Sequence, residues 1–140
     1  MEILRITSKN RSLVSAFLEI AGGSTLEKFR YCQSRPLEII DNHVATFVVY
    51  HEKQSIAYGH LDQVDDTIWL GIAIAETFHG QGIGKLMMSH LLTFARLEKI
   101  LNIKLAVDRD NDAAIPLYER FGFKEINRTE KVLFMEWVFG

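Results

Sequence analysis

The chain has 140 residues, a length that suits one compact domain with its own core. Its 16 basic and 18 acidic residues give a formal charge of −2, which argues against a nucleic-acid-binding domain because such domains need a basic face. The single cysteine, Cys32, excludes an internal disulfide, and no apolar run approaches the roughly 20 residues that span a bilayer. The opening residues, MEILRITSKN, also lack the basic and then apolar pattern of a signal peptide, so we expect a cytoplasmic protein without a membrane segment.

The first quarter of the chain predicts one strand and two helices. Residues 2–6 are short and apolar, as in a strand, and Ser8 would cap the first helix. The apolar residues of that helix recur at helical spacing: Leu13, Val14, Phe17, Leu18 and Ile20. After two glycines, the tetrapeptide STLE at 24–27 predicts a capping box for a second short helix that runs to about Cys32.

The middle of the chain predicts three strands. Two β-rich runs between Val44 and Val64 are separated by the tripeptide EKQ at 52–54, which is the pattern of a hairpin. The acidic turn at 65–66 then leads into TIWLGIAIA, residues 67–75, which is apolar throughout. Such a run predicts a central strand that is covered on both faces.

The second half predicts a helix, a strand, another helix and two final strands. The first of these helices runs to about Lys99, with apolar residues along one face: Ile83, Met87, Leu91, Phe94 and Ala95. A strand at 103–107 precedes a helix at 111–121, which Gly122 should end and whose start Pro116 should disturb.

A glycine-rich stretch, FHGQGIGKLM at 78–87, joins the central strand to the long helix. It is not a Walker A loop, because His79 and Leu86 stand where that motif needs glycine and Ser or Thr. It is not a dinucleotide fingerprint either, because Lys85 or Met87 would take the place of the last glycine. The order of strand, glycine loop and helix N-terminus nevertheless favours a phosphate, because exposed N–H groups and the helix dipole attract anions there. The alternative is a tight turn with no ligand.

The stretch NDAAIPLYERFGF at 111–123 adds a second motif. Together the two stretches resemble the GCN5-related N-acetyltransferase (GNAT) family, which carries Gln/Arg-x-x-Gly-x-Gly/Ala after its fourth strand and Asn-x-x-Ala-x-x-Leu-Tyr-x-x-x-Gly-Phe after its fifth. The second pattern is matched at six positions: Asn111, Ala114, Leu117, Tyr118, Gly122 and Phe123.

The predicted element order, β-α-α-β-β-β-α-β-α-β-β, is also the family's order, so the resemblance covers essentially the whole chain. It implies a single α/β (α+β) domain over residues 1–140, with a mixed, mostly antiparallel seven-stranded sheet flanked by about four helices.

The resemblance implies acetyl-CoA as the acyl donor and no metal. The pyrophosphate would lie on the backbone N–H groups of the glycine stretch: Gly80, Gln81, Gly82, Ile83, Gly84 and Lys85. The pantetheine arm would pair with Ile72, Ala73 and Ile74 like an added strand. Asn111 falls at the family's cofactor-contacting asparagine and could equally cap the helix. His79 replaces the family's Gln or Arg, and it would contact a phosphate when protonated or remain a solvated loop residue.

The implied chemistry is direct transfer of the acetyl group to an amine. Tyr118 matches the family's tyrosine near the sulfur and would act as general acid, whereas without the motif it would pass for a half-buried aromatic. The base stays open among His60, Asp62, Glu76, Asp108 and a water chain. Cys32 is not favoured as an acylated nucleophile, because no His or Asp lies close to it in sequence.

For the acceptor we expect a small-molecule primary amine, with amino sugars favoured. Ala106 stands where ribosomal-protein N-terminal acetyltransferases carry a glutamate base, which weighs against peptide N-termini. The segment FRYCQSRP at 29–36 should wall the acceptor site through Arg30, Tyr31 and Arg35.

The alternatives are a protein or peptide N-terminal acetyltransferase and a non-catalytic acyl-CoA-binding module. The apolar end at Val138 and Phe139 could pair strands across a homodimer or complete the sheet within one chain.

Overall fold

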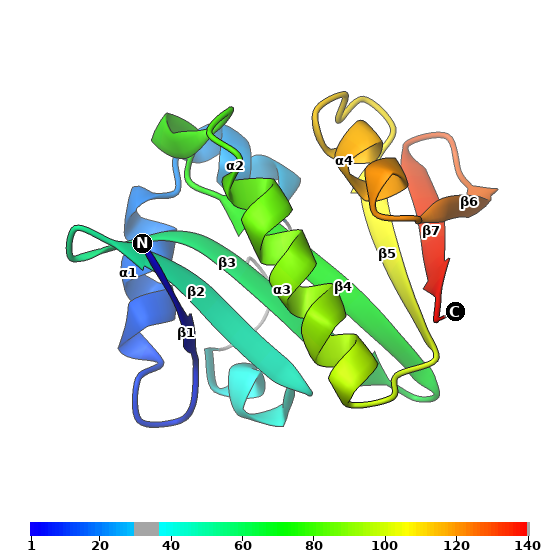
Figure 1. Ribbon diagram of the computed structural model, residues 1–140. Coiled ribbons are helices and arrows are strands. Elements are labelled where there is room, and N and C mark those ends of the chain that lie inside the picture. The colour runs from blue at the N-terminus through cyan, green and yellow to red at the C-terminus, as the bar shows by residue number, and fades with distance from the viewer. Residues whose placement is uncertain (30–36, 140) are drawn as a thin grey trace.

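The structure is a computed structural model that describes residues 1–29 and 37–139 (Figure 1). Its strands are β1 (Glu2–Arg5), β2 (Ala45–His51), β3 (Gln54–Val64), β4 (Thr67–Ile74), β5 (Asn102–Asp108), β6 (Lys124–Arg128) and β7 (Val132–Val138). Its α-helices are α1 (Ser12–Ile20), α2 (Gly23–Lys28), α3 (Ile83–Leu97) and α4 (Ala114–Arg120), and two 3-10 helices are η2 (Leu37–Asn42) and η3 (Glu76–Phe78). The predicted order of strands and α-helices is confirmed.

The strands form one seven-stranded sheet in the order β1-β2-β3-β4-β5-β7-β6. Every neighbouring pair is antiparallel except β4 and β5, which run parallel and are bridged at Trp69 and Lys104. Beyond that bridge the two strands diverge, as Figure 1 shows. The predicted fold class, a mixed and mostly antiparallel sheet flanked by four α-helices, is therefore confirmed.

Apolar clusters cover both faces of the sheet. On one face α3 crosses the middle strands, and its residues Met87, Met88 and Leu91 are fully buried in a cluster that also contains Tyr118 of α4 (Figure 1). On the other face Phe17 of α1 stacks on Tyr58 of β3, with ring centroids 6.2 Å apart. The apolar spacing predicted for both long helices thus marks the faces that they bury.

Both N-terminal helices begin differently from the prediction. A turn held by Asn10 precedes α1: its Oδ1 accepts the Thr7 N–H (2.6 Å), and its Nδ2 donates to the Arg5 carbonyl (3.0 Å). The N-cap of α1 is therefore Arg11, without a side-chain cap, and the predicted cap at Ser8 is wrong. The N-cap of α2 is Gly22, and no side chain caps it, so the capping box at 24–27 does not form. The predicted extension of α2 to Cys32 lies outside the described residues.

The β2–β3 hairpin is tighter than predicted. Glu52 and Lys53 both have positive φ angles, 50° and 64°, which is the geometry of a two-residue type I′ turn. Gln54 already belongs to β3 and pairs with His51. The loop therefore has two residues rather than three.

The central strand β4 is less covered than its apolar sequence predicted. Ile72 and Ile74 are only half-buried, although Leu70 and Ala73 are buried. The reason is the departure of β5, which leaves one edge of β4 without a neighbouring strand over its second half.

The end of α4 matches the prediction for Gly122, whose φ is 96°. The Gly122 N–H donates to the Glu119 carbonyl (3.0 Å) and the Phe123 N–H donates to the Tyr118 carbonyl (3.1 Å). This is a Schellman motif, and its usual apolar contact joins the rings of Tyr118 and Phe123, with centroids 6.1 Å apart. The motif therefore fixes Tyr118 as well as the turn.

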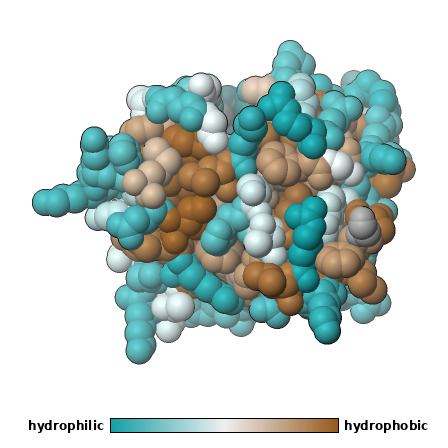
Figure 2. Space-filling view, in the orientation of Figure 1, coloured by the Kyte–Doolittle hydropathy of each residue, from teal (hydrophilic) through white to brown (hydrophobic). Residues whose placement is uncertain are grey.

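The surface of this molecule is mixed in character. Figure 2 shows hydrophilic residues around the outline of one face and apolar residues in separate patches between them. Val138 is exposed but pairs with Asn102 of β5, so it completes the sheet within the chain, and the homodimer stays a prediction. Among the described residues, no helix has the length and apolarity that crossing a bilayer would require.

Candidate functional site

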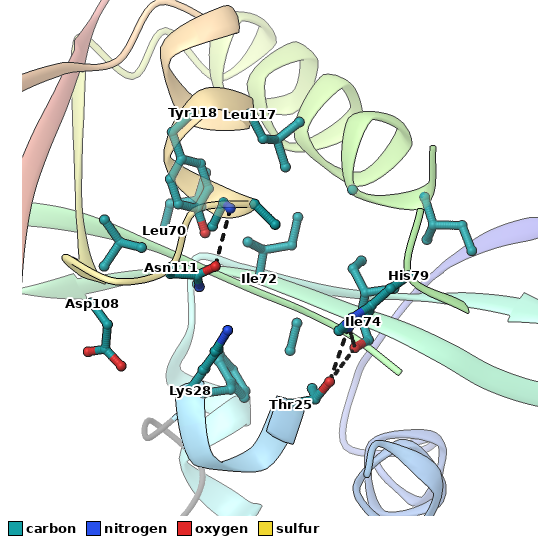
Figure 3. A pocket seen from close by; sticks show the side chains of 18 of the residues that line it. Thr25, Lys28, Leu70, Ile72, Ile74, His79, Asp108, Asn111, Leu117 and Tyr118 are labelled. Atoms are coloured by element: carbon teal, nitrogen blue, oxygen red, sulfur yellow. Dashed lines mark hydrogen bonds between the residues drawn. The ribbon is translucent and has the colours of Figure 1, made fainter. Parts of the chain in front are cut away.

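The divergence of β4 and β5 opens a pocket of about 980 Å³. Its walls come from α2, β3, β4, the glycine stretch, β5 and α4, and Figure 3 shows their side chains converging on one space. The pocket thus reaches both faces of the sheet through the gap between two neighbouring strands.

The open edge of β4 presents backbone groups to this pocket. In the antiparallel β3–β4 pair, Ala75 N–H donates to the Ile56 carbonyl (2.9 Å), which places Ala75 and Ile56 in a hydrogen-bonded pair. Such pairs alternate along antiparallel strands, so Ile72 and Ile74 turn their N–H and C=O groups away from β3 and toward the gap. Of the three predicted pantetheine contacts, Ile72 and Ile74 have this orientation, whereas Ala73 faces β3 with its backbone.

The glycine stretch leads into α3 through two left-handed residues. Gly80 has φ 77°, and Gly82 has φ 80° and is the N-cap of α3. Only glycine adopts this geometry without strain, and the first N–H groups of α3 lack partners within the helix. Of residues 80–85, the predicted pyrophosphate contacts, the pocket is lined by Gly80, Gly82, Ile83, Gly84 and Lys85, whereas Gln81 does not line it.

His79 lines the pocket, but its Nε2 edge points back at the protein. Its Nε2–H donates to the Ile74 carbonyl (2.9 Å) and lies 3.2 Å from Thr25 Oγ1 (Figure 3). Thr25 Oγ1–H donates to the same carbonyl (2.8 Å). The side chain of His79 therefore joins the glycine stretch, β4 and α2, and a phosphate contact would have to use Nδ1.

Tyr118 and Asn111 meet on the α4 side of the pocket. Tyr118 is 7% exposed, and its hydroxyl points into the space that Asn111 borders (Figure 3). Burial raises the pKa of the Tyr118 phenol, so the hydroxyl keeps its proton throughout the physiological range. Asn111 Oδ1 accepts the Ala114 N–H (3.2 Å), which confirms its expected capping contact, although α4 itself begins only at Ala114.

Three of the four predicted base candidates line the pocket: His60, Asp62 and Asp108. Glu76 does not line it, because its side chain packs over Gly22, where an added Cβ would lie 2.9 Å from Glu76 Cβ. Arg30, Tyr31, Arg35 and Cys32 lie outside the described residues.

Side chains of this site that sequence reasoning missed include Thr25, Lys28, Trp69 and Tyr58. The first three line the pocket, and Tyr58 Oη lies 2.6 Å from His60 Nδ1. A usable signal existed for Tyr58, because residues two apart on a strand share a face. Within the described ranges, no group of three or more His, Cys, Asp or Glu side chains could hold a metal ion.

The chain matches the family model described as the acetyltransferase (GNAT) family over residues 11–123. It belongs to the GNAT family.

Two curated relatives of this GNAT chain align with about half of it. One is the ribosomal protein bS18 alanine N-acetyltransferase of Salmonella typhimurium, 32% identical over 62 residues, which are 44% of this chain and 42% of that protein. The other is the spermine/spermidine N(1)-acetyltransferase of Bacillus subtilis, 38% identical over 65 residues, which are 45% of this chain and 43% of that protein. The matched region therefore spans less than half the length of each relative.

A solved GNAT structure is similar over nearly the whole chain. The PaiA N-acetyltransferase from Thermoplasma acidophilum, in complex with coenzyme A, superposes with a TM-score of 0.77 at 16% identity, covering 99% of this chain and 98% of that chain. At this identity the likeness establishes the shared fold.

Proposed function

We propose that this chain is an acetyl-CoA-dependent N-acetyltransferase that transfers the acetyl group directly to the primary amine of a small molecule. One observation carries the proposal: a single pocket brings together the open edge of β4, the glycine stretch at the start of α3 and the hydroxyl of Tyr118. The strand edge and the glycine stretch suit the binding of acetyl-CoA, and the hydroxyl suits protonation of the leaving sulfur.

Acetyl-CoA would bind along the open edge of β4. The pantetheine amides would pair with the backbone of Ile72 and with the Ile74 N–H, as a peptide strand adds to a sheet edge. The pyrophosphate would then reach the N–H groups at the start of α3, where the helix dipole adds about half a positive charge. Lys85 lines the pocket at the same place and supplies a full charge.

The reaction asks the protein to position two substrates and to move protons. The amine nitrogen attacks the thioester carbon, the C–N bond forms and a tetrahedral oxyanion results, which a backbone N–H of β4 would stabilise. The C–S bond then breaks, and the sulfur leaves with the electron pair. Tyr118 donates its proton to that sulfur and recovers one from the nitrogen, so transfer from an ammonium acceptor releases one proton overall.

Two acceptor classes compete with a small molecule. The Salmonella relative acts on a ribosomal protein alanine and the Bacillus relative on spermine or spermidine. Ala106 lines the pocket and provides no carboxylate for a peptide N-terminus, which supports the small-molecule choice. We propose amino sugars within that class and a cytoplasmic setting in which Cys32 stays reduced.

The test is coenzyme A thiol release from acetyl-CoA with glucosamine, spermidine and an alanine-ended peptide, each against a blank without amine. We expect amine-dependent release with at least one small molecule, and mass spectrometry should show the acetylated amine. Release with the peptide alone would overturn the choice of acceptor class. Tight acetyl-CoA binding without release by any amine would make the chain a binding module instead.

A further inference from the structure

The strand β3 directs three polar side chains to the face of the sheet opposite α3. Tyr58, His60 and Asp62 occupy every second position of the strand and therefore share this face. The side chains of Ala57 and Leu61 lie on the other face, in the apolar cluster beneath α3. His60 is only 2% exposed, yet it lines the pocket. A buried imidazole at the wall of a reaction pocket suggests a chemical role, and its surroundings define which role.

Gly71 lets the imidazole of His60 reach over β4. The two residues pair directly across β3 and β4. A Cβ built on Gly71 would overlap His60 Nε2 and lie 2.6 Å from His60 Cε1, so any other residue would push the ring away. The Nε2 edge of the ring therefore lies above β4, one residue from Ile72, whose backbone faces the proposed donor.

The other edge of the ring is held in place. Tyr58 Oη lies 2.6 Å from His60 Nδ1. The rings of His43 and Phe29 pack against the imidazole, with centroids 4.6 Å and 6.2 Å away. If Nδ1–H donates to Tyr58 Oη, the neutral ring carries its lone pair on Nε2, on the side of the proposed donor.

The other two acids of the pocket are less well placed. Asp62 lies opposite Trp69, where β4 is still bridged to β5 and the gap is closed. Asp108 is the last residue of β5, the strand that moves away, and it pairs with Val132. His60 is therefore the candidate base that lies beside the open part of β4.

We propose that His60 is the general base of the acetyl transfer and that Tyr58 positions it, an inference that rests on the proposed function. Nε2 of neutral His60 takes one proton from the acceptor ammonium, the resulting neutral amine attacks the thioester, and the imidazolium returns the proton to solvent after the transfer. Among the described residues, His43 packs on this ring, and the other titratable groups that line the pocket with it are Lys28, Asp62, His79, Lys85, Asp108, Tyr118 and Arg120.

The test compares acceptors that need a base with one that does not. Glucosamine and spermidine carry ammonium groups near pH 7, whereas hydroxylamine, a much weaker base, is largely neutral there. His60→Gln should lower kcat/KM for the ammonium acceptors by about a hundredfold and for hydroxylamine by less than about threefold. Calorimetry should give an unchanged acetyl-CoA affinity. His51→Gln, at the far end of β2, is the matched control and should keep wild-type values for every acceptor.

Two further variants test the positioning. Gly71→Ala should reproduce the selective loss, because the added Cβ displaces the ring. Tyr58→Phe should move the acidic limb of the pH profile of kcat/KM to lower pH, because the imidazolium loses the oxygen that accepts its Nδ1–H. A merely structural role for Tyr58 would leave that midpoint in place.

The outcomes separate this inference from the proposed function. A wild-type protein that acetylates none of the amines overturns the proposed function. An active wild type whose His60→Gln variant keeps the wild-type ratio between ammonium acceptors and hydroxylamine overturns the assignment of His60. If that variant does not fold, unchanged ratios and pH profiles in Gly71→Ala and Tyr58→Phe overturn it instead.

Discussion

Replacing Tyr118 with phenylalanine removes one hydroxyl from the proposed acid and leaves the rest of its environment intact. The ring would still pack against Phe123, and the Schellman motif that fixes it uses only backbone groups. We therefore expect the free energy of unfolding near pH 7 to change by less than about 1 kcal/mol. Any large loss of activity would then report on chemistry rather than on folding.

The expected size of that loss follows from the place of the hydroxyl. Tyr118 is buried at the pocket wall, so its hydrogen bond to a leaving thiolate would be charge-assisted and shielded from water. Hydrogen bonds to charged groups contribute about 1.5–3 kcal/mol, which corresponds to a decrease in kcat of about ten- to a hundredfold. Because the bond forms only as sulfur leaves, KM for acetyl-CoA should stay within about a factor of two.

The assay should first establish that the chemical step limits turnover. Single-turnover mixing of acetyl-CoA-loaded protein with the amine separates the transfer from the release of coenzyme A. An acyl donor with a more acidic leaving thiol provides a further control, because its thiolate needs a proton less and the variant should lose less activity with it. An unchanged single-turnover rate in Tyr118→Phe, or an equal loss with both donors, would refute the assignment of the acid.

Three other outcomes are expected. Gly82→Ala should weaken acetyl-CoA binding in calorimetry and lower stability by about 1–2 kcal/mol, because φ is 80° there, whereas Gly23→Ala, which meets nothing within 4 Å, should leave affinity unchanged. Thr25→Val removes one of the two donors to the Ile74 carbonyl and should lower Tm by a few degrees, while Thr25→Ser should restore it. Burial raises the pKa of the Tyr118 phenol in the folded protein. The free energy of unfolding should therefore be constant below about pH 10 and fall at higher pH by about 1.4 kcal/mol per pH unit, because the unfolded state ionises first. Urea unfolding at pH 9 to 11 should show this loss in the wild type and a smaller one in Tyr118→Phe.

The sequence predicted the local parts of this site well. Asn111 and Gly122 lie at the two ends of α4, and the capping contacts predicted for them depend on backbone geometry that local sequence controls. The same holds for the φ of Gly82, because a helix that follows a glycine turn leaves few alternatives. Short-range physics was enough for these residues.

Contacts across the chain were out of reach. The local sequence at 24–27 predicted that Thr25 belongs to a capping box. Its hydroxyl instead donates to the Ile74 carbonyl of β4 and lies beside His79, which is 54 residues away in the sequence. The half-buried state of Ile72 was equally hidden, because an apolar run cannot tell whether the next strand stays beside it or departs. In both cases the outcome depends on an element that is distant in the sequence and close in the fold.

The single bridge between β4 and β5 has a consequence for how the folded chain responds to its substrate. Over most of their length β4 and β5 are not joined by inter-strand hydrogen bonds. An extended pantetheine arm would add hydrogen bonds along the open edge of β4. The substrate would then act as a temporary strand in the gap between β4 and β5. Amide hydrogen exchange should show this directly, with slower exchange at Ile72 and Ile74 when coenzyme A is present and no change at Ala73, which already bonds to β3.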